Sequence, residues 1–252
     1  MRNVNKNNTL NEFKELVEHN LNRKLAYMSD DFNEKQTYAL ELFKKRLFLE
    51  EVIEEAISFN KKIKWNEKNK NLQLTTTAED LIEVFKLRSE VFHDIGYENS
   101  FSDIIEGLNF DIFDKTSAIV YYKKDGEFRG TCRMIFDSVN KLPSDNIYSF
   151  DDVRQKNNLI GEISRNVVKY RNKGLSLEFK YLMRAMCNLV LDNDINLALS
   201  GIKKEHFKMF SKFGTVEIIK ELSHYGIIEE PCLIVSYNPN VVSKFIKKAF
   251  LK

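Results

Sequence analysis

Charged and aromatic side chains form four groups along the chain whose residue types could bind a carboxylate and move a proton. The groups are Arg88 and Phe92 with Tyr97 in "LRSEVFHDIGY", Asp111 and Asp114 in "FDIFD", Arg133 in "TCRMIF", and Glu162 with Arg165 in "GEISR". Arginine holds a carboxylate through two parallel hydrogen bonds, and Glu or Asp is a common proton acceptor. Each group alone has an ordinary explanation, because charged helix pairs are usually solvated and Asp-x-x-Asp is usually a turn or a cap. Only their combination indicates a site.

Arg133 departs from these ordinary explanations because it lies between Cys132 and Met134 in a strand that looks buried. A buried arginine needs a carboxylate partner, since an unpaired charge in a protein interior is costly. Asp111 and Asp114 are the nearest candidates in the sequence. We therefore predict that Arg133 is mostly buried and paired with one of them.

From Leu72 onward the chain alternates between strand-like and helix-like segments. The predicted order is strand, helix, hairpin, strand, helix, strand, helix, strand and strand, at residues 72–77, 77–92, 117–137, 159–168, 176–193, 195–201, 204–214, 215–222 and 230–238. Thr77 is the expected N-cap of the first helix, and Asp125-Gly126 is the expected turn of the hairpin. This order predicts an α/β fold, an α+β sandwich in which helices flank a mixed central sheet.

Residues 1–70 are predicted to form a helical extension in front of a domain of residues 71–252. Thr9 and Glu12 form a capping box, and a longer helix after "MSDD" repeats apolar residues on one side as far as Phe59. The polar and basic segment 60–71 marks the boundary. Because the apolar stripe needs burial, we expect the extension to pack on or beside the sheet domain, or to pair two protomers.

The composition argues against several classes of protein. The formal charge of the 252 residues is only +2, which argues against a dedicated nucleic-acid binder. Three cysteines without a CxxC pair predict no disulfide framework, and four scattered histidines leave little material for a metal site. No apolar run approaches the roughly 18–20 residues of a membrane span, and the start has no signal-peptide core. We expect a soluble, cytoplasmic protein.

Taken in order, "LRSEVF", "FDIFD", "DGEFRGTCRMI" and "GEISR" resemble the acyl-homoserine-lactone (autoinducer) synthases of quorum sensing. They equally resemble the N-acyl amino acid synthases, a related branch of the GNAT acyltransferase superfamily. The resemblance covers Leu72 to Asn238. Two features depart from the autoinducer synthases: the first 70 residues precede the domain that matches, and Tyr97 stands where those enzymes carry a tryptophan.

The resemblance implies transfer of an acyl group from a thioester to an amine, without a covalent enzyme intermediate and without a tightly bound cofactor or metal. Glu162 would accept the amine proton. The catalytic set it implies is Glu162, Arg165, Asp111, Asp114 and Arg133. The substrate-binding set it implies is Arg88, Phe92, Tyr97, Arg171 and Gly174.

The related fold also has a characteristic backbone around its site. Two central strands splay at a bulge and expose N–H groups toward the thioester, and the residues after "EISR" match that place. The segment "RNKGLS" at 171–176 would then open a helix N-terminus toward the phosphate of phosphopantetheine.

The resemblance further implies two substrates. The donor is expected to be acyl carrier protein, which is acidic and could dock on a basic helical stripe of Lys204, Lys208 and Lys212. The acceptor is either an amino acid or S-adenosylmethionine, and Tyr97 is a weaker platform for a sulfonium than tryptophan, which favours the amino acid. The alternative, from a different class, is a non-catalytic acyl-binding or regulatory protein on the same fold.

Overall fold

The chain divides into two compact units, Met1–Val52 and Ile53–Lys252. The computed structural model describes Glu15, His19 and residues 30–157, 159–169, 176–211, 216–225, 228–238 and 241. Helix α2 (Asp30–Asn60) begins in the first unit and ends in the second. The helix predicted at the start of the chain lies outside the described residues except for Glu15 and His19, which are helical.

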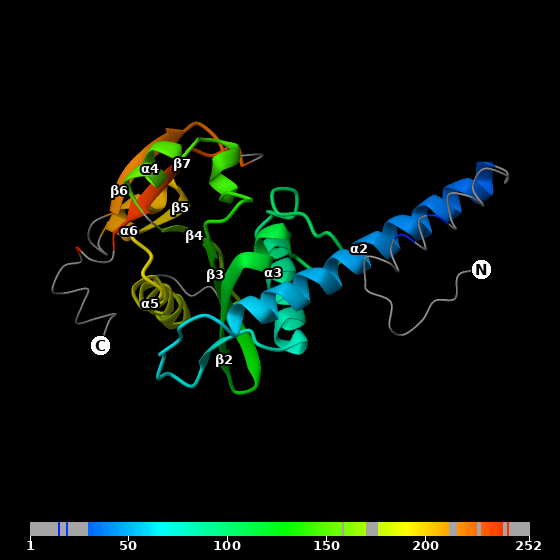
Figure 1. The fold of residues 1–252 in the computed structure, drawn as a ribbon, viewed down its shortest axis with the longest axis horizontal. Coiled ribbons are helices and arrows are strands. Elements are labelled where there is room, and N and C mark those ends of the chain that lie inside the picture. The colour runs from blue at the N-terminus through cyan, green and yellow to red at the C-terminus, as the bar shows by residue number, and fades with distance from the viewer. Residues whose placement is uncertain are drawn as a thin grey trace. The chain divides into compact units, whose positions relative to one another are not determined.

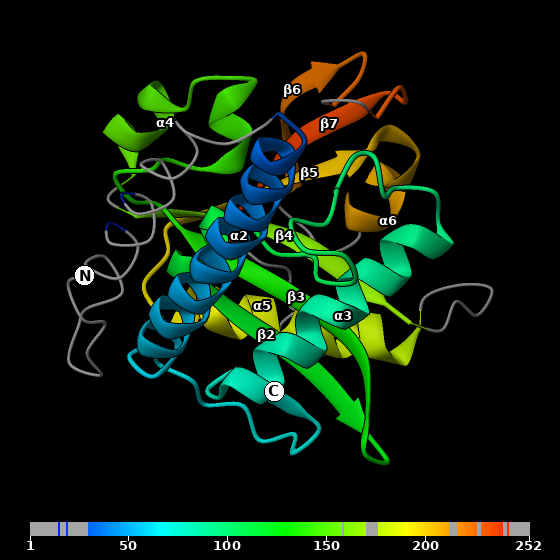
Figure 2. The same cartoon turned by 90° about the vertical axis from the view of Figure 1, so that its right-hand side faces the viewer.

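A mixed sheet forms the centre of the second unit. Within the described residues it has seven strands in the order β1-β2-β3-β4-β5-β7-β6. They are β1 (Leu72–Leu74), β2 (Ser117–Lys124), β3 (Glu127–Phe136), β4 (Ile160–Val168), β5 (Leu197–Lys203), β6 (Val216–Leu222) and β7 (Cys232–Tyr237). Strands β4 and β5 pair in parallel and the other neighbours are antiparallel. Figure 2 shows the labelled part of this order, from β2 low in the view to β6 at the upper edge of the sheet.

Two helices cover opposite faces of strands β2 to β4 (Figure 1). Helix α5 (Leu177–Asp192) buries an apolar stripe that includes Leu182 and Met186 against Val120 and Met134. Helix α3 (Ala78–Asp94) packs Leu87 against Val167 on the other face. The predicted fold class, a mixed sheet flanked by helices, is confirmed. No helix in the described part of the chain is long and apolar enough to span a membrane.

A helix cap and a hairpin turn lie where the sequence predicts them. Thr77 Oγ1 accepts from the backbone N–H of Asp80 at 3.2 Å and caps α3. The hairpin between β2 and β3 turns at Asp125 and Gly126, whose φ angles of 53° and 82° suit a two-residue turn that matches the twist of the strands.

The described part of the segment 204–214, which ends at residue 211, is not one continuous α-helix as the sequence predicts. Within it, residues Lys204–His206 form a 3₁₀ turn, η3, and residues Phe207–Phe210 form the α-helix α6. The backbone N–H of Lys204 donates to the carbonyl oxygen of Pro231 at 2.9 Å, which extends the pairing at the end of β5 and delays the helix. A continuous helical stripe through Lys204 and Lys208 is therefore not formed.

Strand β4 carries a bulge in its middle. Thr131 and Arg133 are two residues apart on β3, but their partners on β4, Val167 and Ser164, are three apart. The extra residue is accommodated at Arg165, whose φ of 51° is in the left-handed region. Side chains alternate between the faces of a regular strand, so without the bulge Arg165 would point away from the face that Ser164 occupies. The bulge turns Arg165 toward α3.

Strands β4 and β5 separate after a short ladder. Their parallel pairing ends at Glu162 and Leu199, although β4 continues to Val168 and β5 remains paired with β7. Ser200 Oγ donates to the carbonyl oxygen of Ile163 at 3.1 Å, just where the strands part. A bulge and a separation of strands, as the resemblance implies, are both present in the described strands, but the bulge lies at Arg165 itself and not after it.

The polar segment between α2 and β1 is held against α5 by side-chain hydrogen bonds. Lys64 N–H donates to Asn193 Oδ1, and Asn193 Nδ2 donates to the Lys64 carbonyl oxygen, each at 3.0 Å. The side chain of Glu67 is buried and accepts hydrogen bonds from Arg184 and Asn188. This segment is an ordered part of the unit that carries the sheet.

Asn60, the last residue of α2, is buried against the start of β2. Its Nδ2 donates to the carbonyl oxygen of Ser117 at 3.0 Å, and its Oδ1 accepts from the N–H of Ile119 at 3.0 Å. The side-chain amide thus pairs with the β2 backbone in the way that a neighbouring strand would.

Replacing Asn60 by alanine is expected to lower the free energy of unfolding by about 1–3 kcal/mol, because two buried backbone groups of β2 lose their partner. Urea denaturation of the purified chain measures this change. Asn140→Ala, at an exposed asparagine, is the matched control and should change little. Equal stabilities for the two variants would contradict this account of the β2 edge.

Candidate active site

Three arginines and two aspartates meet on the α3 face of the sheet. Arg133 binds Asp111 through two hydrogen bonds, Nη1 to Oδ1 at 2.6 Å and Nη2 to Oδ2 at 2.9 Å. The same Nη1 lies 3.0 Å from Asp114 Oδ1. Arg165 Nη2 donates to Asp111 Oδ2 at 2.9 Å, and Arg88 Nη1 donates to Asp114 Oδ1 at 2.8 Å. Arg133 is buried and touches both aspartates, so its predicted pairing is confirmed.

A single 3₁₀ turn, η1 (Ile112–Thr116), presents both aspartates. Asp111 is its N-cap and accepts from the N–H of Phe113 at 2.9 Å, while Asp114 accepts from the N–H of Asp111 at 2.9 Å. The Asp-x-x-Asp spacing therefore makes a capping box. The carboxylate oxygens can accept further hydrogen bonds, and these come from the arginines. The motif is therefore both a helix cap and the acidic partner of the arginines.

The cluster holds three guanidinium groups against two carboxylates, which leaves it with excess positive charge. Burial alone would raise the pKa of Asp111, but the charges of Arg133 and Arg165 hold it well below its ordinary value. Burial lowers the pKa of Arg165, and the charges of Arg133 and Arg88 add to this effect against the opposing charge of Asp111. An anion at the cluster would compensate this excess positive charge.

Unpartnered N–H groups support the same conclusion. Among the described residues, no acceptor lies within hydrogen-bond distance of Arg88 Nε and Nη2 or of Arg165 Nε and Nη1, and these atoms are buried. The Nε and Nη2 atoms of Arg88 are the pair that can grip a carboxylate side-on. A bound carboxylate would supply both the missing negative charge and the missing acceptors.

Aromatic rings cover Arg165. The centre of its guanidinium lies 4.4 Å from the ring centroid of Phe101 and 5.5 Å from that of Phe92. Tyr97, which the sequence motif singles out with Phe92, has Lys203 Nζ 4.9 Å from its ring centroid instead. Phe101 belongs to no motif and is missed by sequence reasoning. It is fixed by its loop, in which Asn109 Nδ2 donates to the Phe101 carbonyl oxygen at 2.6 Å.

Glu162 lies on the same face as the arginine cluster, because it is opposite Ile135 just as Ser164 is opposite Arg133. Its side chain is buried, and both of its oxygens accept from Ser144: the N–H reaches Oε2 at 3.1 Å and Oγ reaches Oε1 at 3.0 Å. Burial raises the pKa of Glu162 to about 7, although the hydrogen bonds of Ser144 and the charge of Arg133 oppose this. A carboxyl group with this pKa can exchange protons near neutral pH.

Ser144 reaches Glu162 because a separate ion-pair network fixes its segment. Arg154 of α4 (Asp151–Lys156) binds Asp137 through Nε at 2.7 Å and Asp145 through Nη2 at 2.6 Å. Asp145 follows Ser144 in the 3₁₀ turn η2 (Pro143–Asn146), so this clamp holds the turn over β4. No sequence motif contains Ser144, and its local signal is Pro143, which opens the turn.

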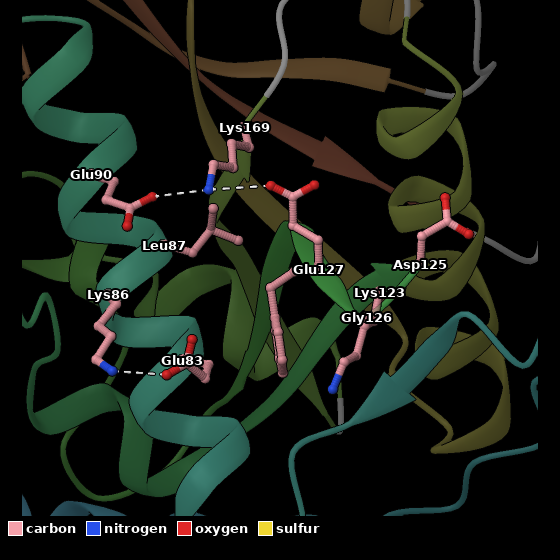
Figure 3. Close-up of a pocket in the computed structure, with 10 residues that line it drawn as sticks. Glu83, Lys86, Leu87, Glu90, Lys123, Asp125, Gly126, Glu127 and Lys169 are labelled. Atoms are coloured by element: carbon pink, nitrogen blue, oxygen red, sulfur yellow. Dashed lines mark hydrogen bonds and ion pairs between the residues drawn. The ribbon is translucent and has the colours of Figure 1, made fainter.

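A pocket of about 580 Å³ lies elsewhere, between α3 and the β2–β3 hairpin (Figure 3). Its charged residues neutralise one another: Lys169 lies 3.4 Å from both Glu90 and Glu127, and Lys86 lies 2.8 Å from Glu83. The predicted catalytic residues do not line it. The arginine cluster, and not this pocket, is therefore the candidate active site.

Some predicted site residues lie outside the described residues, namely Arg171, Gly174 and Lys212. Lys204 and Lys208 are exposed, and Lys204 Nζ is ion-paired with Glu221 at 2.7 Å. Across the described chain, no group of three or more His, Cys, Asp and Glu side chains is arranged to hold a metal ion.

Comparisons with known proteins show similarity in sequence profile and in fold. The sequence profile of the family described as N-acyl amino acid synthase FeeM matches residues 83–238. The structure of FeeM, an N-acyl amino acid synthase from uncultured soil microbes, is similar with a TM-score of 0.56 and 16% identity, over 71% of this chain and 93% of FeeM. No curated protein matches the sequence.

Two acyl-homoserine-lactone synthases share the fold. LasI is similar with a TM-score of 0.53 and 21% identity, over 71% of this chain and 93% of LasI. BjaI, a CoA-dependent enzyme solved with S-adenosylmethionine and isopentyl-CoA, is similar with a TM-score of 0.53 and 18% identity, over 68% of this chain and 81% of BjaI. The fold is thus common to enzymes that acylate different amines.

The profile match extends from α3 through the strands that carry the arginine cluster and Glu162 to the end of β7. Because it spans more than half of the 252 residues, the chain is an acyltransferase that belongs to the FeeM family of N-acyl amino acid synthases.

Proposed function

We propose that this enzyme transfers a fatty acyl chain from the phosphopantetheine thioester of acyl carrier protein to the amine of an amino acid. The observation that carries the proposal is the buried arginine cluster, which has excess positive charge and unpartnered N–H groups. An amino acid presents one carboxylate next to its amine. Bound to Arg88 or Arg165, that carboxylate would place the amine on the face of β4 that carries Glu162.

The aromatic contacts favour an amino acid over S-adenosylmethionine. A sulfonium is recognised by the open faces of aromatic rings. Here Arg165 lies against Phe92 and Phe101, and Lys203 lies over Tyr97, so protein cations already occupy the faces of these rings.

The second candidate function is lactone synthesis from S-adenosylmethionine. It is supported by the folds of LasI and BjaI.

In the proposed reaction the amine nitrogen attacks the thioester carbonyl, the C–N bond forms and the C–S bond breaks. Glu162 accepts the amine proton, and a proton returns to the departing thiolate, so the reaction is balanced. The backbone N–H groups of β4 beyond its separation from β5 are candidates to stabilise the oxyanion. We assign Arg133, Asp111 and Asp114 the task of holding Arg165 and Arg88 in place.

A direct attack is also favoured by the state of the cysteines. Cys132, Cys187 and Cys232 are free and buried. Burial raises the pKa of Cys132 to about 12 and that of Cys187 to about 11, and it raises the pKa of Cys232 as well. None of them is poised as a thiolate nucleophile. Three free thiols also fit a reducing compartment, and we propose that the enzyme acts in the cytoplasm.

Acyl carrier protein is proposed as the donor for two reasons. The pairing of β4 with β5 ends at Glu162 and Leu199, and the pantetheine arm would bind where the two strands part. The exposed Lys204 and Lys208 follow β5 in the chain. The pairing of Lys204 with Glu221 weakens this basic face, so acyl-CoA must be compared directly.

The first prediction from this proposal concerns the products. Purified enzyme given long-chain acyl carrier protein or acyl-CoA, with each amino acid or S-adenosylmethionine, should release an N-acyl amino acid, detected by mass spectrometry. Faster turnover with the carrier protein is expected. Methylthioadenosine release with S-adenosylmethionine would show lactone synthesis instead, and no product from any pair would overturn the proposal.

The second prediction concerns the acceptor carboxylate. Arg165→Gln should raise the KM for the amino acid roughly 10- to 100-fold, because a charge-assisted hydrogen bond is lost. The wild-type enzyme should prefer an amino acid to its carboxamide, and the variant should largely lose this preference. Arg129→Gln, in β3 but away from the cluster, is the control. If Arg165→Gln still prefers the amino acid to its carboxamide as strongly as the wild type does, Arg165 does not bind the acceptor carboxylate.

The third prediction concerns the proton acceptor. The wild-type kcat/KM should rise with pH through about 7, as Glu162 loses its proton. Glu162→Gln should lower turnover roughly 10²- to 10⁴-fold and abolish this rise. Glu106→Gln, at an exposed glutamate, should behave as wild type.

Stability provides a check on the same variant. The folded-state pKa of Glu162 is raised from 4.5 to about 7, so the folded chain binds an extra proton in this window and loses stability as the pH rises through it. Glutamine removes that loss, and Glu162→Gln should therefore remain folded at pH 8. A folded variant with near-normal turnover would exclude Glu162 as the base.

A further inference from the structure

The hydroxyl of Ser144 contacts a second hydroxyl, that of Tyr225. Tyr225, in the connection between β6 and β7, places its hydroxyl 3.3 Å from Ser144 Oγ. Ser144 in turn donates to both oxygens of Glu162. The three side chains come from η2, β4 and the β6–β7 connection and form one continuous chain of polar contacts. No motif of the sequence contains Ser144 or Tyr225.

We propose that Tyr225 and Ser144 are positioning residues that fix the orientation of Glu162 and set its affinity for a proton. This inference rests on the proposed role of Glu162 as the proton acceptor. Neither residue needs to touch the substrate, since both act through the glutamate. The mechanism described above does not otherwise use them.

The direction of the hydrogen bonds follows from the number of protons. Each hydroxyl carries one proton, and the Ser144 hydroxyl donates its proton to a hydrogen bond with Oε1 of Glu162. Tyr225 must then be the donor in its contact with Ser144. A serine hydroxyl that accepts a hydrogen bond becomes a stronger donor, so Tyr225 stabilises the ionised form of Glu162 from one residue away.

The electrostatic surroundings agree with a neutral, donating tyrosine. Burial raises the pKa of Tyr225 to about 12, and the negative charge of Glu162 acts in the same direction. The hydrogen bond to Ser144 and the charge of Arg165 oppose this rise in the pKa, and Cys232 adds to it. Tyr225 therefore keeps its proton across the pH range in which Glu162 titrates.

The groups that face Glu162 come from each neighbouring element. They are Arg133 on β3, Ser144 and Asp145 in η2, and Tyr225 after β6. On β5, the residue paired with Glu162 is the apolar Leu199. Arg133 favours the ionised carboxylate and Asp145 disfavours it. Removing the Tyr225 hydroxyl alters none of these charges, so its effect on Glu162 can be measured separately.

Gly201 of β5 makes room for the ring of Tyr225. A Cβ atom added at Gly201 would lie 3.3 Å from Tyr225 Cε2 and 3.6 Å from its Cζ. These contacts are tight and would push the ring by a few tenths of an ångström. Gly201→Ala therefore offers a variant that keeps the hydroxyl but displaces it.

The experiment measures the protonation of Glu162 directly. The carboxyl band of Glu162 is identified by infrared difference spectroscopy between the enzyme and Glu162→Gln and is titrated without substrate. Tyr225→Phe should raise the pKa of Glu162 by about half a unit to one unit, and Ser144→Ala by about one unit or more. Gly201→Ala should produce a smaller shift in the same direction. Tyr148→Phe, at a partly exposed tyrosine of the neighbouring turn, is the control and should produce none.

Kinetics provide the second readout. In Tyr225→Phe the pH at which kcat/KM rises should move upward by the same amount, with the KM for the acceptor changed less than about twofold. A general loss of folding would not shift a titration in this direction. A Glu162 pKa in Tyr225→Phe that stays within about 0.2 unit of wild type would overturn the inference.

The two proposals fail separately. If Glu162→Gln keeps normal turnover while Tyr225→Phe still shifts the carboxyl band, the catalytic role of Glu162 falls and its positioning by Tyr225 stands. If Glu162→Gln is inactive and Tyr225→Phe leaves the band unmoved, the catalytic role stands and the positioning role falls.

Discussion

The shared carboxylate of Asp111 is the interaction on which the site depends. It receives hydrogen bonds from Arg133 on β3 and Arg165 on β4, and Asp114 from the same turn receives Arg88 on α3. Buried guanidinium groups are tolerated only when carboxylates compensate them. The requirement therefore joins a helix, two strands and a turn at one point. The same contacts that hold these elements together set the positions of Arg88 and Arg165, the proposed ligands of the acceptor carboxylate.

Much of this arrangement could be predicted from the sequence because it follows from local patterns and from one strong energetic rule. Alternating strands, capped helices and the Asp125-Gly126 turn predict the order of elements, and that order is found. Arg133 in a buried strand demands an acidic partner, and Asp111 and Asp114 supply it. The helix after β5 is present as α6 but begins later than predicted, because a tertiary contact to Pro231 extends the strand where the side-chain pattern favours a helix.

The surroundings of Glu162 and Arg165 could not be predicted in the same way. Ser144 lies 18 residues before Glu162 in an irregular segment, and Tyr225 lies 81 residues after Ser144. Residues this far apart meet only because α4 and its Arg154 clamp hold η2 over the sheet. Phe101 likewise reaches Arg165 through a loop whose path depends on side chains such as Asn109. Sequence rules describe neighbours within a few residues, whereas these contacts are created by the assembled fold.

The left-handed backbone at Arg165 has an evolutionary consequence. A non-glycine residue in this region costs of order 1 kcal/mol, and glycine or asparagine would fit the bulge with less strain. Selection for folding alone would therefore favour a small residue at this position. An arginine there indicates that its side chain is retained for another reason, at the expense of stability. Laboratory evolution of this chain for heat resistance without selection for activity should accordingly find position 165 among the first that it changes.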